Sequence, residues 1–331
     1  MEMKKLERTM NAKCNAKTKT SQKGKTVAAL GKKLGGRDMQ LLLLALPVVI
    51  YVFIFSYLPM AGVVLAFKDY NYADGVFGSP WVGFENFKFF FQSDMAFHVT
   101  VNAVLYNLFF IVVGTVIFVA VALLLNEVVN AKAIKYYQTT MFFPYFLSWP
   151  VVAFILYVLI SPSYGILNHV VEAMGMEPRN WYAEAGIWPV IICAFGVWKQ
   201  MGMCVLLNYA VLIGIDRNYY EAAQIDGANK WQTTIHISLP FLVPITIIQF
   251  ILSVGRIFNS DFGLFYQLTQ GATILSTQTE VIDTYVYKLL MNSNDISMGA
   301  AVGLYQSVVG LVLVLLTNYI VSKVDSSNAM F

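Results

Sequence analysis

The chain has 331 residues, of which 58% are hydrophobic and only 12% are charged, and its formal net charge is +3. Soluble domains carry about 25% charged residues, so this composition excludes an ordinary soluble domain. A helix needs roughly 20 apolar residues to cross the hydrocarbon core of a bilayer, and several stretches of this chain are that long. We therefore expect an all-α, polytopic membrane protein.

The beginning of the chain is strongly basic. Residues 1–37 hold eleven Lys or Arg residues against two acidic ones, and the first apolar run that follows is too long for a signal peptide. Basic segments stay on the cytoplasmic side and are attracted to anionic lipid. We predict a disordered cytoplasmic tail over residues 1–38, followed by a transmembrane domain over 39–325. An arm that binds nucleic acid is the disfavoured alternative, and we expect no nucleic-acid partner.

Six apolar runs are each long enough to span a membrane. They lie near residues 40–67, 99–126, 136–161, 187–214, 236–258 and 299–321. The segments 68–98, 162–186 and 259–298 contain more acidic than basic residues, whereas the short loops after the second and fourth runs are basic. Positively charged loops remain in the cytoplasm, so we predict that both termini are cytoplasmic. The aromatic segment 80–93 is too short to span and predicts a helix at the membrane surface.

The sequence offers no catalytic or metal-binding pattern. Cys193 and Cys204 are eleven residues apart on one apolar run, about 16 Å along a helix, which is too far for a disulfide; Cys14 is isolated in the tail. The stretch KGKT at 23–26 is not a phosphate-binding loop, because Lys19 stands where its first glycine would be. We expect no metal, no cofactor and no enzymatic activity in this chain.

The stretch YYEAAQIDGANKWQTTIHISLPF, residues 219–241, is a polar interruption between the fourth and fifth runs. Asn218 followed by Glu221 predicts an N-terminal capping box, and Gly227 predicts the left-handed residue that ends a short helix. So short a helix is marginal in water unless it packs against something. We therefore interpret it as a cytoplasmic docking element, and an ordinary helical loop is the alternative.

The spacing of this segment is specific. Glu-Ala-Ala, three residues, Gly, nine residues and Ile-x-Leu-Pro resemble the EAA motif of ABC importer permeases, which forms the coupling helix that docks into the ATPase subunit. Further stretches resemble recurring pieces of carbohydrate permeases: VGFENF at 82–87, YGILN at 164–168, FGLFYQLT at 262–269 and VIDTYVY at 281–287. The resemblance covers about residues 40–321. It departs at residues 213–217, where the family has a Gln-x-Ile-Pro turn.

The resemblance implies a type I ABC importer permease (MetI-like) bundle with six transmembrane helices and a coupling segment at 216–240. It also implies a bacterial cytoplasmic membrane, a second homologous permease, two ATPase subunits that bind ATP and Mg²⁺, an extracellular solute-binding protein and an oligosaccharide substrate. The residues expected to couple to the ATPase are Tyr220, Glu221, Ala222, Ala223, Asp226, Gly227 and Ala228.

Polar groups inside the apolar runs are candidates for a transport path, because a charge at the centre of a span costs about 2.5–3.5 kcal/mol on insertion scales. Lys199 lies near the middle of the fourth run, and Gln249, Ser253 and Arg256 share one face of the fifth. Helix–helix hydrogen bonding or snorkelling to the interface is the alternative. The resemblance implies that these two helices line the cavity. The candidate path residues are Lys199, Gln200, Met203, Ser253, Arg256 and Asn259.

Other transport classes fit the sequence less well. A secondary transporter driven by an ion gradient would favour an intramembrane carboxylate, and none of the six runs has an Asp or Glu well inside it. An ABC importer for a solute other than a sugar is a second alternative. The GxxxG pattern at 299–303 predicts close packing of the last span against a neighbouring helix.

Overall fold

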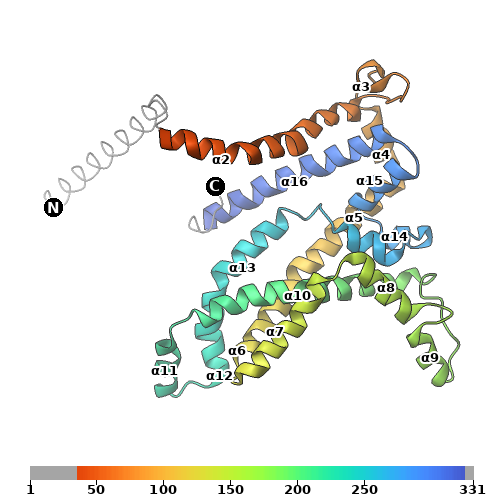
Figure 1. Cartoon of the computed structure of the whole chain (residues 1–331). Coiled ribbons are helices and arrows are strands. Elements are labelled where there is room, and N and C mark those ends of the chain that lie inside the picture. Colours follow the sequence, from red (N-terminus) through yellow and green to blue (C-terminus); the bar gives the residue numbers. More distant parts are fainter. Residues whose placement is uncertain (1–35, 325–331) are drawn as a thin grey trace, which may run out of the picture. The chain divides into compact units, whose positions relative to one another are not determined.

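The computed structural model describes residues 36–324 (Figure 1). Of the predicted tail 1–38, all but the last three positions lie outside the described residues. The described part is helical and holds a single isolated antiparallel bridge, between Lys68 and Trp81. It falls into two compact units that divide after Ala61.

One long apolar helix begins in the first unit. α2 (Gly36–Val52) continues through the π-helical turn η1 (Phe53–Tyr57) into the 3-10 segment η2 (Leu58–Phe67). The stretch Met39–Phe67 is long and apolar enough to cross a membrane, which confirms the first predicted run. Pro47 lies inside α2 without ending it, as is common for helices in lipid.

The second unit, from Gly62 onward, holds the remaining helices. They are α3 (Gly75–Gly78), α4 (Glu85–Gln92), α5 (Asp94–Phe109), η3 (Phe110–Gly114), α6 (Thr115–Asn126), α7 (Ala131–Phe146), α8 (Trp149–Ile160), α9 (Ile166–Ala173), η4 (Ala185–Ile187), α10 (Trp188–Ile213), α11 (Arg217–Ile225), α12 (Lys230–Thr233), η5 (Thr234–Ser238), α13 (Leu239–Val254), η6 (Gly263–Gln267), η7 (Thr273–Leu275), α14 (Ser276–Thr279), α15 (Ile282–Met291) and α16 (Ile296–Val324). Four continuous stretches, α5–η3–α6, η4–α10, α12–η5–α13 and α16, qualify as spans by length and apolarity. They confirm the second, fourth, fifth and sixth predicted runs.

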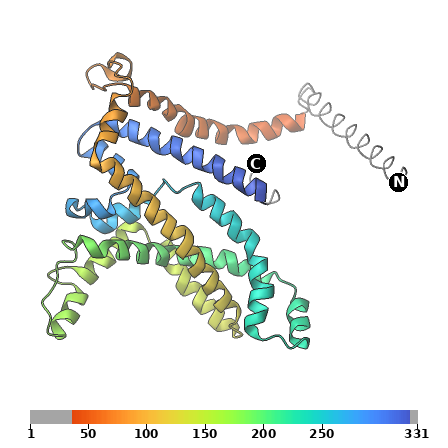
Figure 2. The same ribbon diagram turned by 180° about the vertical axis from the view of Figure 1, so that it is seen from behind.

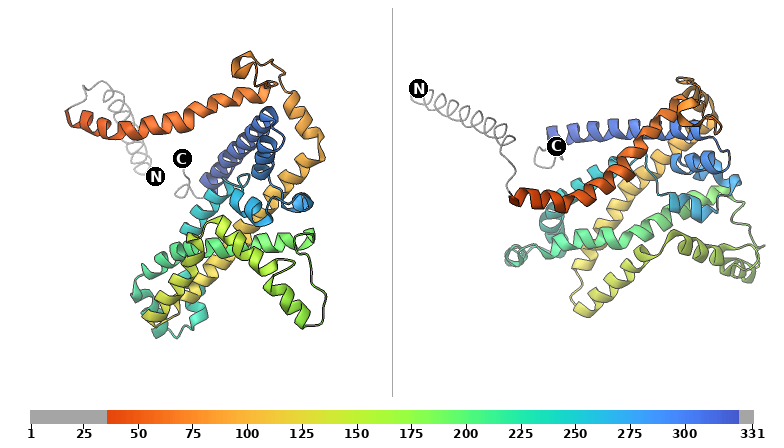
Figure 3. Two further views of the ribbon diagram at one scale, coloured as in Figure 1. Left: turned by 45° about the vertical axis from the view of Figure 1, so that its right-hand side comes forward. Right: turned by 45° about the horizontal axis from the view of Figure 1, so that its top comes forward.

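The third predicted run, 136–161, is not one straight span. α7 ends at Phe146, α8 begins at Trp149, and the two helices are bent by 100° relative to one another (Figure 3). Pro150 has no N–H to donate to the carbonyl of Phe146, which favours a break at this point, and its fixed φ suits the first turn of α8. The described residues thus contain five candidate spans, and a sixth if the bent pair crosses as one.

α10 is the central helix of the second unit and packs against α6, α7 and α13 (Figures 1 and 2). It passes through two buried apolar clusters, one around Trp188 and Ile192 and the other around Val205 and Leu212. Gly202 allows the close contact with α7, because a Cβ there would lie 2.5 Å from the carbonyl oxygen of Met141. The core therefore fixes α10 rigidly between its neighbours.

The VGFENF stretch builds the loop that precedes α4. Gly83 adopts a φ of +64°, and the side-chain amide of Asn86 donates to the carbonyl oxygens of Ala66 and Lys68, both at 3.0 Å. The predicted short helix in 80–93 is confirmed as α4, although its place at a membrane surface stays a prediction. Through Asn86, the stretch binds the backbone at the end of the first span.

The YGILN stretch has a similar structural role after α8. Asn168 is buried; its amide nitrogen donates to the carbonyls of Ser161 (3.3 Å) and Arg179 (2.9 Å), and its oxygen accepts from the Trp181 indole at 2.9 Å. Gly165 is required because a Cβ would lie 2.4 Å from the carbonyl oxygen of Ser161. Asn168 thereby satisfies the backbone of the loop that joins α9 to α10.

Candidate functional site

The predicted coupling helix exists as α11, which lies beside α12 at one end of the second unit (Figure 1). Its first residue is Arg217, and its N-cap is Asp216, whose carboxylate accepts from the N–H of Asn218 at 3.0 Å. The predicted cap, Asn218 with Glu221, is therefore wrong. Asp216 stands two positions earlier, and its side chain accepts from a backbone N–H of the first turn, that of Asn218.

The end of α11 is as predicted. Gly227 has a φ of +77°, the N–H of Ala228 donates to the carbonyl of Ala223 at 2.9 Å, and that of Gly227 donates to Gln224 at 3.1 Å. This pattern is a Schellman motif, which needs a left-handed residue at the glycine position. A reciprocal capping box between Asn229 and Gln232 then starts α12, so the turn between the two helices is well defined.

One face of α11 is attached to the start of the fifth span. The hydroxyl of Tyr220 lies 3.0 Å from that of Ser238, which is buried, and the Tyr219 ring packs on Phe241 with centroids 5.6 Å apart. Tyr220, predicted as a coupling residue, points toward the buried Ser238 and away from the open face of α11. These contacts join α11 to the region where η5 meets α13.

The opposite face of α11 is open. Among the predicted coupling residues, Glu221, Ala222, Asp226 and Gly227 are exposed, and Ala223 and Ala228 are half-buried. Beside them lie two large apolar side chains absent from the predicted set: Ile225, 86% exposed, and Trp231, 72% exposed. Exposed apolar and aromatic side chains with a polar rim are typical of a protein interface. The positions of Ile225 and Trp231 in the motif could have identified these two residues from the sequence.

A shallow cavity of about 320 Å³ lies between α11 and the segment formed by α12 and η5. It is lined by Ala223, Asp226, Gly227, Ala228, Gln232, Thr233, His236 and Ile237. Next to it, Lys230 at the start of α12 forms an ion pair with Glu127 at 2.9 Å, which links the fifth span to the end of α6. Both partners of this pair are largely exposed, so it contributes little stability.

Lys199, the charged residue in the middle of the fourth span, is bound at the α7–α8 bend. Its ammonium donates to the carbonyl oxygens of Pro144 (3.4 Å), Tyr145 (3.2 Å) and Leu147. The last carbonyls of a helix have no partner within the helix, and a cation at that end is favourable. The structure therefore gives Lys199 a structural contact, and its part in a transport path stays a prediction.

The contact continues from the bend to the FGLFYQLT stretch. The Lys199 ammonium lies 5.1 Å from the Trp149 ring centroid, and the Trp149 indole N–H donates to the carboxylate of Asp261 at 2.7 Å. Asp261 in turn accepts from the N–H of Gly263 at 3.0 Å, at the start of η6. A Cβ at Gly263 would lie 2.0 Å from the Trp149 ring. Three separate segments thus meet at Trp149.

The other candidate path residues are not brought together by direct contacts. Gln200, Met203, Ser253 and Arg256 have exposed side chains, and within residues 36–324 none of them forms a side-chain hydrogen bond. Gln249, on the same stripe, has a buried amide nitrogen without a partner among the described residues. α13 ends at Val254, so Gln249 and Ser253 lie on this helix and Arg256 lies in the turn that follows. The part of these residues in a transport path stays a prediction.

Asn259 belongs to a polar cluster that sequence reasoning missed. The amide nitrogen of Gln306 donates to the carbonyl of Phe258 (2.7 Å), to the Asn259 side chain (2.9 Å) and to Asp283 (3.0 Å). The N–H of Ser260 donates to the other Asp283 oxygen at 2.7 Å. Burial raises the pKa of the Asp283 carboxyl, and these hydrogen bonds lower it in part. The cluster joins the segment after α13 to α15 and α16.

Comparison with known proteins identifies the family. The family described as "Binding-protein-dependent transport system inner membrane component" matches residues 97–326. Protein LplB of Bacillus subtilis is 35% identical over 87% of this chain and 90% of its own length. The polygalacturonan/rhamnogalacturonan transport system permease protein YteP of the same species is 31% identical over 86% and 88%.

Solved structures agree with this relationship. A chain of a bacterial alginate ABC transporter, in complex with an alginate pentasaccharide-bound periplasmic protein, is 28% identical with a TM-score of 0.78, over 87% of this chain and 96% of that one. A chain of a bacterial ABC transporter that imports the acidic polysaccharide alginate is 29% identical with a TM-score of 0.79, over 87% and 97%. The likeness that the motifs predicted is confirmed. This chain belongs to the family of binding-protein-dependent transport system inner membrane components.

Proposed function

We propose that this chain is the transmembrane permease subunit of an ATP-driven importer for an oligosaccharide. The observation that carries the proposal is α11, a short helix with one face attached to the fifth span through Tyr220 and Ser238 and the other face open. Such a helix can bind a moving partner and transmit its displacement. The relatives whose printed functions are carbohydrate uptake support the choice of substrate.

In this proposal α11 acts as a lever. When two ATPase subunits close on ATP, α11 moves with the subunit on which it docks. The Tyr220–Ser238 hydrogen bond and the Tyr219–Phe241 ring contact pull on the start of α13. The π-helical turn η5 lies between α12 and α13, and π turns are frequent at functional sites in helices. The spans then reorient around the bound sugar, so that access alternates between the two sides.

The proposal includes the partners that the motif implies. These are a second homologous permease, two ATPase subunits and an external solute-binding protein. The alginate transporter structure, whose complex includes a periplasmic protein, supports the last of these. ATP and Mg²⁺ would be bound by the ATPase subunits, and this chain would carry out no covalent chemistry. Both termini and α11 would face the cytoplasm of a bacterial cell.

Within the oligosaccharides, an acidic one is favoured. YteP is described as a polygalacturonan/rhamnogalacturonan permease, and the solved relatives carry the acidic polysaccharide alginate. In this chain Arg256 is exposed in the turn that follows the fifth span and has no acidic partner among the described residues. Arginine binds carboxylates in a two-pronged geometry, so Arg256 suits a uronate.

The test is uptake by proteoliposomes that contain the whole complex with its binding protein. We expect accumulation of an acidic oligosaccharide that requires ATP inside the vesicles and persists when ionophores collapse the proton and sodium gradients. Uptake that continues without ATP and stops with the ionophores would instead establish a secondary transporter. ATP-driven uptake of a solute that is not a carbohydrate would correct the substrate alone.

A further inference from the structure

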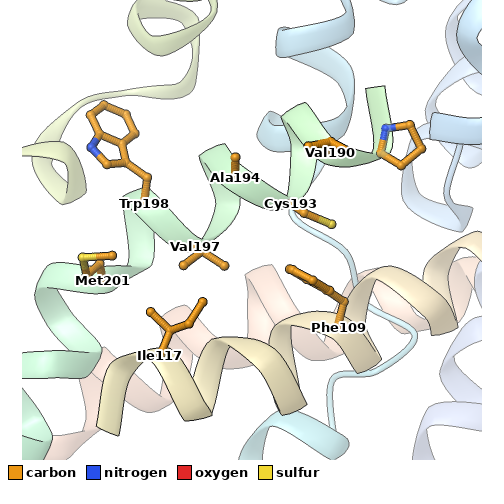
Figure 4. Close-up of a pocket in the computed structure, with 9 residues that line it drawn as sticks. Phe109, Ile117, Val190, Cys193, Ala194, Val197, Trp198 and Met201 are labelled. Atoms are coloured by element: carbon orange, nitrogen blue, oxygen red, sulfur yellow. The ribbon is translucent and has the colours of Figure 1, made fainter. Parts of the chain in front are cut away.

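An apolar groove runs between the second and fourth spans (Figure 4). Its volume is about 450 Å³, and its walls come from α5, α6 and α10. The lining residues are Phe109, Ile117, Pro189, Val190, Cys193, Ala194, Val197, Trp198 and Met201. None of these side chains is charged, so the groove is unsuited to a sugar, which needs polar partners.

The groove is formed by a specific irregularity of the helix opposite α10. The π-helical turn η3 interrupts the second span at Phe110–Gly114, and such a turn shifts the direction of the side chains around it. Phe110 packs on Gly196 of α10, where a Cβ would lie 2.5 Å from its ring. Phe109 instead projects into the groove (Figure 4). The two helices are thus in close contact at Gly196, and the groove lies beside that contact.

The length and position of the groove match one leaflet of a bilayer. Along α10 it extends from Pro189 to Met201, which is about 18 Å of helix. Half of a hydrocarbon core of about 30 Å is about 15 Å. The groove begins one residue after the first residue of α10, Trp188, which places its end near the membrane interface. It therefore covers the depth that a single acyl chain occupies.

The end near Pro189 is polar. A second cavity of about 290 Å³ shares Phe109, Pro189 and Cys193 with the groove and adds Asn102, Leu105, Tyr106, Thr277 and Gln278. The side chains of Asn102 and Tyr106 donate to the backbone carbonyls of Thr277 (3.1 Å) and Gln278 (2.8 Å). The side chains of Thr277 and Gln278 are exposed and make no hydrogen bond to any residue in 36–324. Unused polar groups thus stand where the apolar groove ends.

We propose that this groove binds one phospholipid of the leaflet on the Thr277–Gln278 side. Its acyl chain fills the apolar part from Pro189 to Met201, and its ester or phosphate oxygens accept from the Gln278 amide and the Thr277 hydroxyl. The change from polar to apolar along the groove fits a lipid. The groove extends over only one leaflet, which is the depth of one acyl chain. The site is separate from α11 and is independent of the transported substrate.

The complex, reconstituted in vesicles with a trace of phosphatidylglycerol that carries a photoactivatable diazirine on one acyl chain, tests the site. After irradiation we expect lipid adducts concentrated between Val190 and Met201. The variant Ala194→Trp fills the groove and should lose most of these adducts. Leu207→Trp, on an exposed part of the same helix that does not line the groove, should keep them. Gln278→Ala should weaken labelling without loss of the folded complex.

Two results would overturn the proposal. Adducts spread over all spans in proportion to exposure, and unchanged by Ala194→Trp, would mean that only the bulk bilayer is in contact. A short crosslinker on the native thiol of Cys193 that joined it to the second permease, with no lipid adduct at the groove, would make this surface a protein interface. Uptake measured in parallel separates these outcomes from a failure of the proposed transport function.

Discussion

The ammonium of Lys199 in α10 donates to the carbonyl oxygen of Leu147, the residue that follows the end of α7. Two further carbonyls, of Pro144 and Tyr145, accept from the same group at 3.4 and 3.2 Å. The cost of placing a charge in the middle of a span is therefore offset by hydrogen bonds to backbone oxygens at the 100° bend. The carbonyl oxygens at the bend thus provide acceptors for the Lys199 ammonium, and the ammonium provides these oxygens with a donor.

Lys199→Met keeps the length of the side chain and removes its donors. We expect the free energy of unfolding of the purified complex to fall by about 1.5–3 kcal/mol, the value of a hydrogen bond to a charged group, with reduced uptake. Lys199→Arg, which keeps the charge, should recover most of both. Thermal unfolding in detergent and uptake in vesicles measure the two effects. An unchanged melting temperature with an altered KM would make Lys199 a substrate contact and not a structural one.

Gly263→Ala should destabilise the region around the bend, because the new methyl group would overlap the Trp149 ring that donates to Asp261. Overpacking of this kind costs about 1–3 kcal/mol. The matched control is Gly186→Ala, where a Cβ would meet no atom within 4 Å. Melting temperatures of the two variants, measured side by side, should fall for Gly263→Ala only; an equal effect in both would contradict the contact at Trp149.

Much of α11 could be predicted from local sequence, and much of its surroundings could not. Gly227 was identifiable because a left-handed helix end favours one residue type. The cap was misassigned because Asp216 and Asn218 are both good caps, and the choice depends on where α10 ends. The break near Pro150 had a signal in the sequence, because proline lacks the N–H that a continuing helix uses. The length of the apolar run does not show this signal. The meeting of Gln306 with Asp283 joins separate segments, and no local pattern predicts it.

Gly227→Asp is expected to leave insertion and assembly intact and to remove transport. The residue has a φ of +77° with open space around it, so a side chain brings backbone strain of about 1–2 kcal/mol and a new charge at the turn that positions α11. Gly175→Asp is a matched control, with a φ of +78° and equal space, in the loop after α9. Substrate-stimulated ATP hydrolysis should be lost only in the first variant, and normal hydrolysis there would disprove the docking role.

Asp283 predicts a pH dependence of stability. Burial raises the pKa of its carboxyl above the unfolded value of 3.8, so the folded state binds the proton more tightly. The contribution of the Asp283 carboxyl to the free energy of unfolding is therefore present at low pH. It is lost as the pH rises from the pKa of the unfolded state through the pKa of the folded state. Asp283→Asn should remove that decline. Melting temperatures of the wild type and the variant, taken as a difference curve over this range, should diverge with pH; parallel curves would contradict the raised pKa.

Arg256→Gln tests the choice of an acidic substrate. The substitution keeps a polar side chain at the exposed position just after α13 and removes the guanidinium that we propose binds a uronate. Uptake of an oligosaccharide with carboxylates should fall by roughly 10- to 150-fold, which corresponds to the 1.5–3 kcal/mol of a charge-assisted hydrogen bond. Uptake of its neutral, reduced counterpart should change little. Equal losses for the two sugars would show that Arg256 does not recognise charge.

The account depends most on the open face of α11, and a crosslink tests it directly. In a chain whose native cysteines are replaced, Ile225→Cys places a thiol where the side chain is 86% exposed, and Val170→Cys on α9 places one at a residue that is 50% exposed. With a short bifunctional reagent and the assembled complex, we predict a permease–ATPase product from Ile225→Cys, absent with Val170→Cys. A complex that assembles and transports but yields no such product, or yields it only from Val170→Cys, would contradict the coupling function of α11.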